Sequence, residues 1–393
     1  MTKSFLVLLI AQFLSAFADN AVLFIIIAFV IHTLDTPPWY VPALQSAFLI
    51  AFVVLAPWSG FIADKFAKSQ VLFWANLVKA FGGVLLLCDI EPLFAYGVVG
   101  VGAALYSPAK YGILPELVEQ DDLVKANSWI EGSTILAILM GMLIGAKVAD
   151  TSTTIALVGA IGLFISSAVI TLYLPICLHL NTVENRPALR DFFKQIVCFF
   201  KMPLTYFVIL GGALFWGVAA TLRVILVAWA PMVLHLNTAS DIAQLTFFLA
   251  IGIIIGSSIV STFISLNSLS RVGFAAYAMA LCIVGLSFTN VMLEAQSILL
   301  LTGIMGGIFI VPINASLQNL GVKSIGTGHA VAIQGFFHNM AMLVALSIYS
   351  YATAQSMNPI AAMLSLGLVF LIAVLVLTFY FFIRKKTIYV TDS

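Results

Sequence analysis

The sequence predicts an all-α membrane protein whose twelve transmembrane helices form two six-helix bundles. The first observation is composition: apolar residues make up 62% of the 393 residues, charged residues only 8%, and the mean hydropathy is +1.14. About a quarter of a typical soluble chain is charged, so a soluble globular fold is excluded. The net charge of +1 also excludes a bulk electrostatic attraction to nucleic acid.

The second observation is the spacing of apolar runs, each close to the roughly 20 residues that cross a bilayer. The first run is too long for a signal peptide and lacks a cleavage site of small residues. The only long connection covers residues 178–203, so we expect bundles at 1–177 and 204–393 joined by a cytoplasmic linker. The predicted spans are 5–32, 41–63, 71–88, 93–117, 125–147, 153–177, 204–234, 242–265, 271–289, 295–320, 327–355 and 359–383.

The distribution of lysine and arginine predicts the orientation of the chain. Of the 17 Lys and Arg residues, thirteen lie at the two termini and in the even-numbered connections, and the odd-numbered connections contain Lys147 alone. Cytoplasmic loops carry the excess of positive charge, so both termini are expected in the cytoplasm. Three cations lie inside spans, and we expect one of them, Lys79, to extend its ammonium toward the cytoplasmic surface.

The third observation is an internal repeat of the two halves. Such parallel repeats, related by a pseudo-two-fold axis along the membrane normal, are typical of transporters that bind their substrate near the middle of the membrane. Small residues at Gly141, Gly145, Gly252 and Gly256 are expected to let helices pack closely. The matching positions are Gly102 with Gly306, Pro108 with Pro312, Lys110 with Asn314, and Glu131-Gly132 with Gln334-Gly335.

Charged residues in the middle of spans are the main candidates for a binding site. Asp19 lies about fourteen residues from either end of the first span, where a carboxylate costs about 2.5–3.5 kcal/mol and therefore tends to face a partner or a polar cavity. With Asn20 it is a candidate ligand for a cation, a proton or the amine of a zwitterion; the alternative is a structural hydrogen bond. Arg223 carries a planar donor fork that suits phosphate or carboxylate, unless its role is structural. Lys110 and Glu131 lie at similar depth, so an ion pair between them is expected, which an incoming anionic group would open.

The remaining polar residues of the spans predict a secondary polar cavity, and His338 or the carboxylates are candidates for a coupling proton or sodium ion. No phosphate-binding G-x-x-x-x-G-K-[ST] loop, metal cluster or catalytic triad spacing occurs, so the sequence predicts a transporter with no cofactor rather than an enzyme. Cys88, Cys177, Cys198 and Cys282 are scattered and are expected to be small apolar fillers. The secondary cavity residues are Gln12, Glu131, Asn314, Gln334, His338 and Asn339.

The connection after the second span reads GFIADKFAKS. It resembles the G-x-x-x-D-[RK]-x-x-[RK] loop signature of the major facilitator superfamily, in which the acidic and basic residues latch the cytoplasmic ends of the bundles. The resemblance implies that Gly60, Asp64, Lys65 and Lys68 form a cytoplasmic gate and do not bind substrate. The alternative is an ordinary basic loop.

Further stretches in both halves resemble bacterial lysophospholipid transporters of that superfamily: AQFLSAFADNAVLF, YSPAKYGILPELV, LFWGVAATLRVILVAWAP and AVAIQGFFHNMAML. The resemblance implies a flippase of the bacterial inner membrane that acts as a monomer by alternating access. Its expected substrates are lysophosphatidylethanolamine and related lysolipids, moved from the outer to the cytoplasmic leaflet. A separate acyltransferase, an acyl-carrier-protein synthetase, would re-acylate them there; some relatives carry it fused, and this chain is expected to lack it.

The candidate residues fit that substrate. Arg223 and Lys110 suit the phosphate, and Asp19 with Asn20 suits the ammonium. One alternative is a proton- or sodium-coupled antiporter that exports amphipathic drugs, because part of the antiporter signature is present in the fifth span. There Ala146 replaces the expected proline, and we interpret the signature's glycines, which include Gly132, as helix-packing positions. A second alternative is a receptor or scaffold that does not transport.

Overall fold

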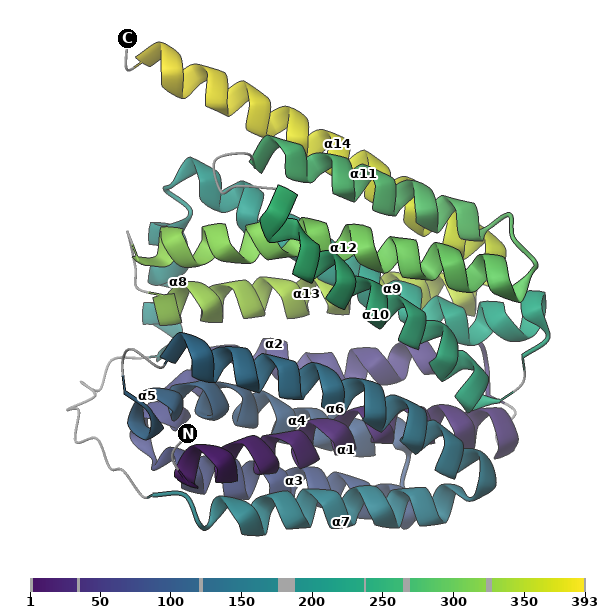
Figure 1. Ribbon diagram of the computed structural model, residues 1–393. Coiled ribbons are helices and arrows are strands. Elements are labelled where there is room, and N and C mark those ends of the chain that lie inside the picture. The colour runs from purple at the N-terminus through teal and green to yellow at the C-terminus, as the bar shows by residue number, and fades with distance from the viewer. Residues whose placement is uncertain are drawn as a thin grey trace. The chain divides into compact units, whose positions relative to one another are not determined.

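The computed structural model describes residues 3–33, 36–119, 123–175, 188–236, 238–263, 269–322 and 327–391. Within these ranges every regular element is a helix (Figure 1). The first half contains α1 (Lys3–Thr33), α2 (Tyr40–Lys65), α3 (Lys68–Leu87), α4 (Pro92–Gly112), α5 (Leu114–Leu117), α6 (Leu123–Thr151) and α7 (Thr153–Thr171). The second half contains α8 (Ala188–Phe199), α9 (Pro203–Leu234), α10 (Ala239–Phe263), α11 (Leu269–Leu286), α12 (Met292–Val322), α13 (Thr327–Ala354) and α14 (Pro359–Thr391).

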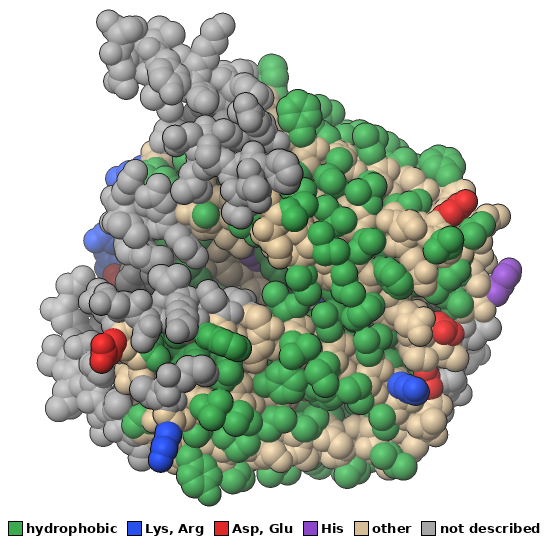
Figure 2. Space-filling view, in the orientation of Figure 1, with side chains coloured by type: hydrophobic (Ala, Val, Ile, Leu, Met, Phe, Trp, Pro, Cys, Tyr) green, Lys and Arg blue, Asp and Glu red, His purple; other side chains and the backbone are tan. Residues whose placement is uncertain are grey.

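Eleven of these helices are long and apolar enough to cross a membrane, and a shorter apolar helix at Val272–Leu286 supplies the twelfth predicted span. On the face shown in Figure 2, hydrophobic side chains cover the middle of the helices, and the described charged side chains lie toward the helix ends. This is the pattern of a multi-pass membrane protein, in which the hydrocarbon core of the bilayer excludes unpaired charge. The predicted twelve-helix fold is confirmed.

Two segments differ from the prediction. The predicted span 93–117 is interrupted, because α4 ends at Gly112 and the short α5 follows. Pro115 in the first turn of α5 has no N–H and cannot continue the hydrogen bonds of α4. The linker 178–203, predicted as a loop, contains the helix α8, which has an apolar and a polar side. Its low average hydropathy hides it from a search for apolar runs. The first part of the linker, residues 178–187, and Cys177 before it lie outside the described residues.

Contacts divide the chain into two compact units. Unit 1 comprises residues 1–36, 43–192 and 238–243, and unit 2 comprises residues 37–42, 193–237 and 244–393. In unit 1, α1 packs against α6 and α7, and α3 packs against α4 and α7. In unit 2, α9 packs against α13 and α14, and α11 packs against α12 and α14. The same pairs of neighbours occur in both units, as the internal repeat in the sequence predicts.

Glycines bring α6 close to α1 in unit 1. A Cβ atom on Gly141 would collide with the carbonyl oxygen of Phe17, and one on Gly145 would lie 2.7 Å from the Cβ of Ala21. These two positions confirm the predicted close packing. A Cβ atom on Gly132 of the same helix would meet no heavy atom of another described element within 4 Å, so the expectation that Gly132 is a packing position is wrong.

A second pair of glycines brings α10 close to α12 in unit 2. A Cβ atom on Gly252 would collide with the carbonyl oxygen of Leu300, and one on Gly256 would collide with that of Ile304. Any side chain at these positions would push the helices apart. Small residues serve this purpose in membranes because helix association there depends on van der Waals packing rather than on the hydrophobic effect.

Candidate functional site

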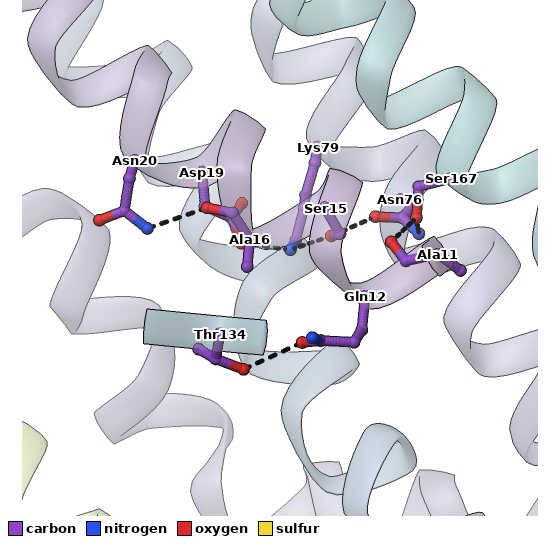
Figure 3. A network of polar contacts seen from close by, with 10 residues as sticks. All are labelled: Ala11, Gln12, Ser15, Ala16, Asp19, Asn20, Asn76, Lys79, Thr134 and Ser167. Atoms are coloured by element: carbon purple, nitrogen blue, oxygen red, sulfur yellow. Dashed lines mark hydrogen bonds and ion pairs between the residues drawn. The ribbon is translucent and has the colours of Figure 1, made fainter. Parts of the chain in front are cut away.

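A buried ion pair lies near the middle of α1. The ammonium of Lys79, on α3, donates to Oδ2 of Asp19 at 2.7 Å (Figure 3). The side chain of Lys79 is 1% exposed and that of Asp19 is 21% exposed. The prediction that Lys79 extends toward the cytoplasmic surface is therefore wrong. An opposite charge within reach outweighs extension to the surface, because attraction between charges is strong in a medium of low dielectric constant.

A chain of hydrogen bonds extends from this ion pair through unit 1 (Figure 3). Lys79 also donates to the hydroxyl of Ser15 at 3.0 Å, and Ser15 donates to Oδ1 of Asn76 at 2.7 Å. The amide nitrogen of Asn76 donates to Ser167 at 2.9 Å, and Ser167 donates to the carbonyl oxygen of Ala11 at 2.6 Å. The chain links α1, α3 and α7. Buried polar groups need such partners, and a satisfied network holds each member in one position.

Sequence reasoning missed Ser15, Asn76 and Ser167 as members of this site. A signal was present, because Ser15 precedes Asp19 by one helical turn and Asn76 precedes Lys79 by nearly one turn. Residues three or four apart share a face of a helix. Polar residues so spaced in apolar spans indicate a common polar face.

One oxygen of the ion pair has no hydrogen-bond donor among the described residues. This oxygen, Oδ1 of Asp19, is buried. The neighbouring Asn20 does not supply one, because its amide nitrogen donates to the carbonyl oxygen of Ala16 at 2.9 Å. A buried acceptor without a donor costs about 1–3 kcal/mol, so a ligand with N–H or O–H groups would gain by meeting it.

Gln12 connects α1 to α6 in unit 1. Its amide nitrogen donates to the hydroxyl of Ser133 at 2.7 Å, and its amide oxygen accepts from the hydroxyl of Thr134 at 3.0 Å. Its side chain is buried. Both the nitrogen and the oxygen of the Gln12 amide thus form hydrogen bonds with α6, so Gln12 links α1 to α6.

Lys110, on α4, is buried, and its ammonium lies 4.4 Å from the centre of the Tyr111 ring. Glu131, the predicted partner of Lys110, has a side chain outside the described residues, so the predicted ion pair stays a prediction. Unit 2 offers a parallel at the repeat-equivalent positions, where Gln334 of α13 donates to Oδ1 of Asn314 of α12 at 2.7 Å. In unit 2 a hydrogen bond therefore joins α12 and α13, the counterparts of α4 and α6.

The predicted gate lies at the tight connection between α2 and α3. Lys65 ends α2 and is exposed, whereas Lys68 begins α3 and forms an ion pair with Glu116 of α5 at 2.6 Å. The side chains of this pair are 12% and 7% exposed. The side chain of Asp64 is outside the described residues, and a Cβ atom on Gly60 would meet no heavy atom of another described element within 4 Å. The ion pair holds the start of α3 against α5.

In unit 2 the candidate residues lie on α9 and α13. Arg223, on α9, is partly exposed. His338, on α13, is buried beside the ring of Trp216, at a centroid distance of 6.2 Å. Asn339 donates to the carbonyl oxygen of Gly335 at 2.8 Å, the same contact with the preceding turn that Asn20 makes in α1. No group of three or more His, Cys, Asp or Glu residues suited to a metal ion occurs in the part of the chain that the structure describes.

Comparison with known proteins defines the family. Residues 8–346 match the model of the Major Facilitator Superfamily. The chain belongs to this superfamily. Its sequence is 37% identical to that of lysophospholipid transporter LplT of Salmonella arizonae, and the alignment covers 95% of this chain and 94% of the relative. The same identity and coverage hold for LplT of Klebsiella pneumoniae, and LplT of Salmonella heidelberg is 39% identical over 89% of this chain and 88% of the relative.

The fold of this superfamily member is also similar to that of a solved transporter. The crystal structure of the nucleoside transporter NupG superposes with a TM-score of 0.75 at 17% identity, and that of a NupG mutant with 0.76 at 18%. The superposition on the mutant covers 97% of this chain and 99% of the other. At this level of identity the likeness concerns the fold alone.

Proposed function

We propose that this protein transports lysophospholipids. The observation that carries the proposal is Oδ1 of Asp19, a buried carboxylate oxygen at mid-membrane depth that has no donor among the described residues. Charged residues inside membrane spans mark substrate pathways. The ammonium of an ethanolamine headgroup supplies the donors that this oxygen needs. The relatives, named as lysophospholipid transporters, support the same substrate class.

The headgroup divides among residues by its chemistry. We assign the ammonium to the carboxylate of Asp19 and to the amide oxygen of Asn20. The amide nitrogen of Asn20 donates to its own helix, and its oxygen is an acceptor. We assign the phosphate to Arg223 and Lys110. The guanidinium of arginine matches phosphate with two parallel hydrogen bonds, and a lysine acts on it as a point charge.

We further propose that transport runs from the outer to the cytoplasmic leaflet of a bacterial inner membrane, by alternating access, with both termini in the cytoplasm. The excess of lysine and arginine at the termini and in the even-numbered connections supports this orientation. A separate acyltransferase on the cytoplasmic side would consume the product. The protein acts as a monomer in this proposal.

The test is uptake of labelled lysophosphatidylethanolamine by proteoliposomes that contain the full chain. Asp19→Asn and Arg223→Ala are each expected to lower uptake at least about 30-fold, which is the effect of losing one partner of a buried charge pair. Asp89→Asn and Arg190→Ala are matched controls, because both residues are exposed and lie outside the membrane spans. They are expected to transport at the wild-type rate.

Running the assay with and without proton and sodium gradients shows whether an ion is coupled to transport. Saturable uptake that only the two site variants lose supports the proposal. Full uptake by Asp19→Asn would refute the headgroup assignment. Export of amphipathic drugs with no lysolipid movement would instead support an antiporter, and lysolipid binding without movement would support a receptor or scaffold.

A further inference from the structure

We propose that Lys79 is a positioning residue that sets which headgroup charge the site accepts. This inference rests on the proposed function, because it concerns the same carboxylate. Lys79 donates to Oδ2 of Asp19, whereas Oδ1 is the atom without a donor among the described residues. Its side chain is 1% exposed, so Lys79 lies behind the carboxylate and acts on the substrate through it.

The protein encloses the ammonium of Lys79 on several sides. The ring of Tyr106 lies 4.5 Å from Nζ and the ring of Phe164 lies 5.7 Å from it, both within the range of cation–π attraction. Ser15 accepts a second hydrogen bond from the same ammonium. The cation therefore has acceptors and aromatic faces that hold it in one place.

Gly102 of α4 makes room for the stem of this lysine. A Cβ atom on Gly102 would lie 2.6 Å from Cγ of Lys79 and 2.6 Å from the carbonyl oxygen of Ala75. Only a residue without a side chain at this position leaves room for the stem of the lysine beside α4. The lysine is thus built into the bundle and is not a side chain that swings toward the substrate.

The consequence is electrostatic. Asp19 and Lys79 together carry no net charge, so an anionic headgroup such as phosphoglycerol meets no uncompensated negative charge at the site. A zwitterionic headgroup such as phosphoethanolamine still offers its ammonium to Oδ1, which has no donor among the described residues. Without Lys79 the carboxylate would add a negative charge that repels the phosphate of any lysolipid, and a headgroup with its own cation would offset that repulsion better than an anionic headgroup.

The second repeat shows that this counter-ion is not a general requirement of the fold. The sequence spacing that relates Gly102 to Gly306 also relates Asp19 to Arg223 and Lys79 to Ile283. Ile283 is fully buried and apolar. The fold accepts an apolar residue at this position, so a lysine there in unit 1 indicates a function related to the charge of Asp19.

The experiment compares two substrates in proteoliposomes: labelled lysophosphatidylethanolamine, which is zwitterionic, and labelled lysophosphatidylglycerol, which is anionic. The readout is the ratio of their kcat/KM values. Lys79→Met is expected to raise the ethanolamine-to-glycerol ratio about tenfold or more, because the like-charge repulsion falls on the anionic substrate. Asp19→Asn, which leaves the lysine charge, is expected to shift the ratio in the opposite direction. Lys79→Arg is expected to bring the ratio back toward the wild-type value.

A single variant could fail to fold because it leaves one buried charge without its partner. The double variant Asp19→Asn with Lys79→Met leaves no unpaired charge at this place and is the control for that outcome. It is expected to lose the preference that either single variant creates. Equal loss of both substrates in a folded Lys79→Met protein would assign Lys79 a structural role only and overturn the proposal. An unchanged ratio in Asp19→Asn would also overturn it, even if Lys79→Met cannot be purified. A wild-type protein that moves neither lysolipid would instead refute the proposed function.

Discussion

The ion pair between Asp19 and Lys79 makes a quantitative prediction about stability. The two groups are 2.7 Å apart and both lie largely out of water. Removing one partner of such a pair costs about 3–5 kcal/mol, because the other charge stays buried without compensation. We expect this loss in the free energy of unfolding for Lys79→Met, and a similar loss for Asp19→Asn.

The double variant separates the pair from the rest of the network. With both charges removed no buried ion remains at this place, and replacing a buried ion pair by groups of similar volume is often close to neutral. We therefore expect the double variant to be more stable than either single variant. The non-additivity, measured as a double-mutant cycle, should be about 3 kcal/mol.

Reversible unfolding in mixed micelles of increasing SDS content, followed by far-ultraviolet circular dichroism, measures the four free energies. Wild type, both single variants and the double variant are compared under one lipid and detergent condition. Additive losses, within about 0.5 kcal/mol, would show that the two charges do not interact. In that case the structural reasoning about the ion pair of Asp19 and Lys79 would be refuted.

Two further predictions concern packing and orientation. Gly252→Leu should lower the free energy of unfolding by about 1–3 kcal/mol or more, because the new side chain would collide with α12. Gly159→Leu should be tolerated, because a side chain there would face open space. The same SDS titration measures both variants, and equal losses of stability would contradict the packing argument. The orientation is tested in bacterial cells with two variants that each keep a single cysteine, either the exposed Cys88 between α3 and α4 or the exposed Cys198 on α8. The Cys88 variant should react with a membrane-impermeant maleimide in intact cells. The Cys198 variant should react only after the membrane is permeabilised. The reverse pattern would invert the proposed orientation.

The features that the sequence predicted correctly depend on local chemistry. Span length and hydropathy determine which segments cross a bilayer, and the spacing of matched residues such as Pro108 and Pro312 reveals the repeat. The close contacts of Gly141 and Gly252 follow from the requirement for small residues between membrane helices. None of these inferences needs the three-dimensional position of another helix.

The features that the sequence did not predict depend on how a helix is rotated about its axis. Whether Lys79 points to the membrane surface or to α1 is determined by the packing of α3 against α4 and α7. The only signal of that rotation in the sequence is the spacing of Asn76 and Lys79, which indicates a polar face but not the helix that this face contacts. For the same reason Asp19 was predicted as a charged site residue without its partner. The break after Gly112 was missed because a proline in an apolar run is compatible with either a kink or an end.

The repeat explains how one scaffold carries two different charges. The spacing between equivalent residues places Asp19 on α1 and Arg223 on α9, which have the same set of neighbouring helices within their own units. The carboxylate has a counter-ion within its bundle, since Lys79 of α3 pairs with it, whereas the equivalent position on α11 is the apolar Ile283. The two units thus share their helix packing but differ in their buried charges. Under the proposed function, the balanced charge of Asp19 and the positive charge of Arg223 suit a headgroup that always carries a phosphate and only sometimes an amine.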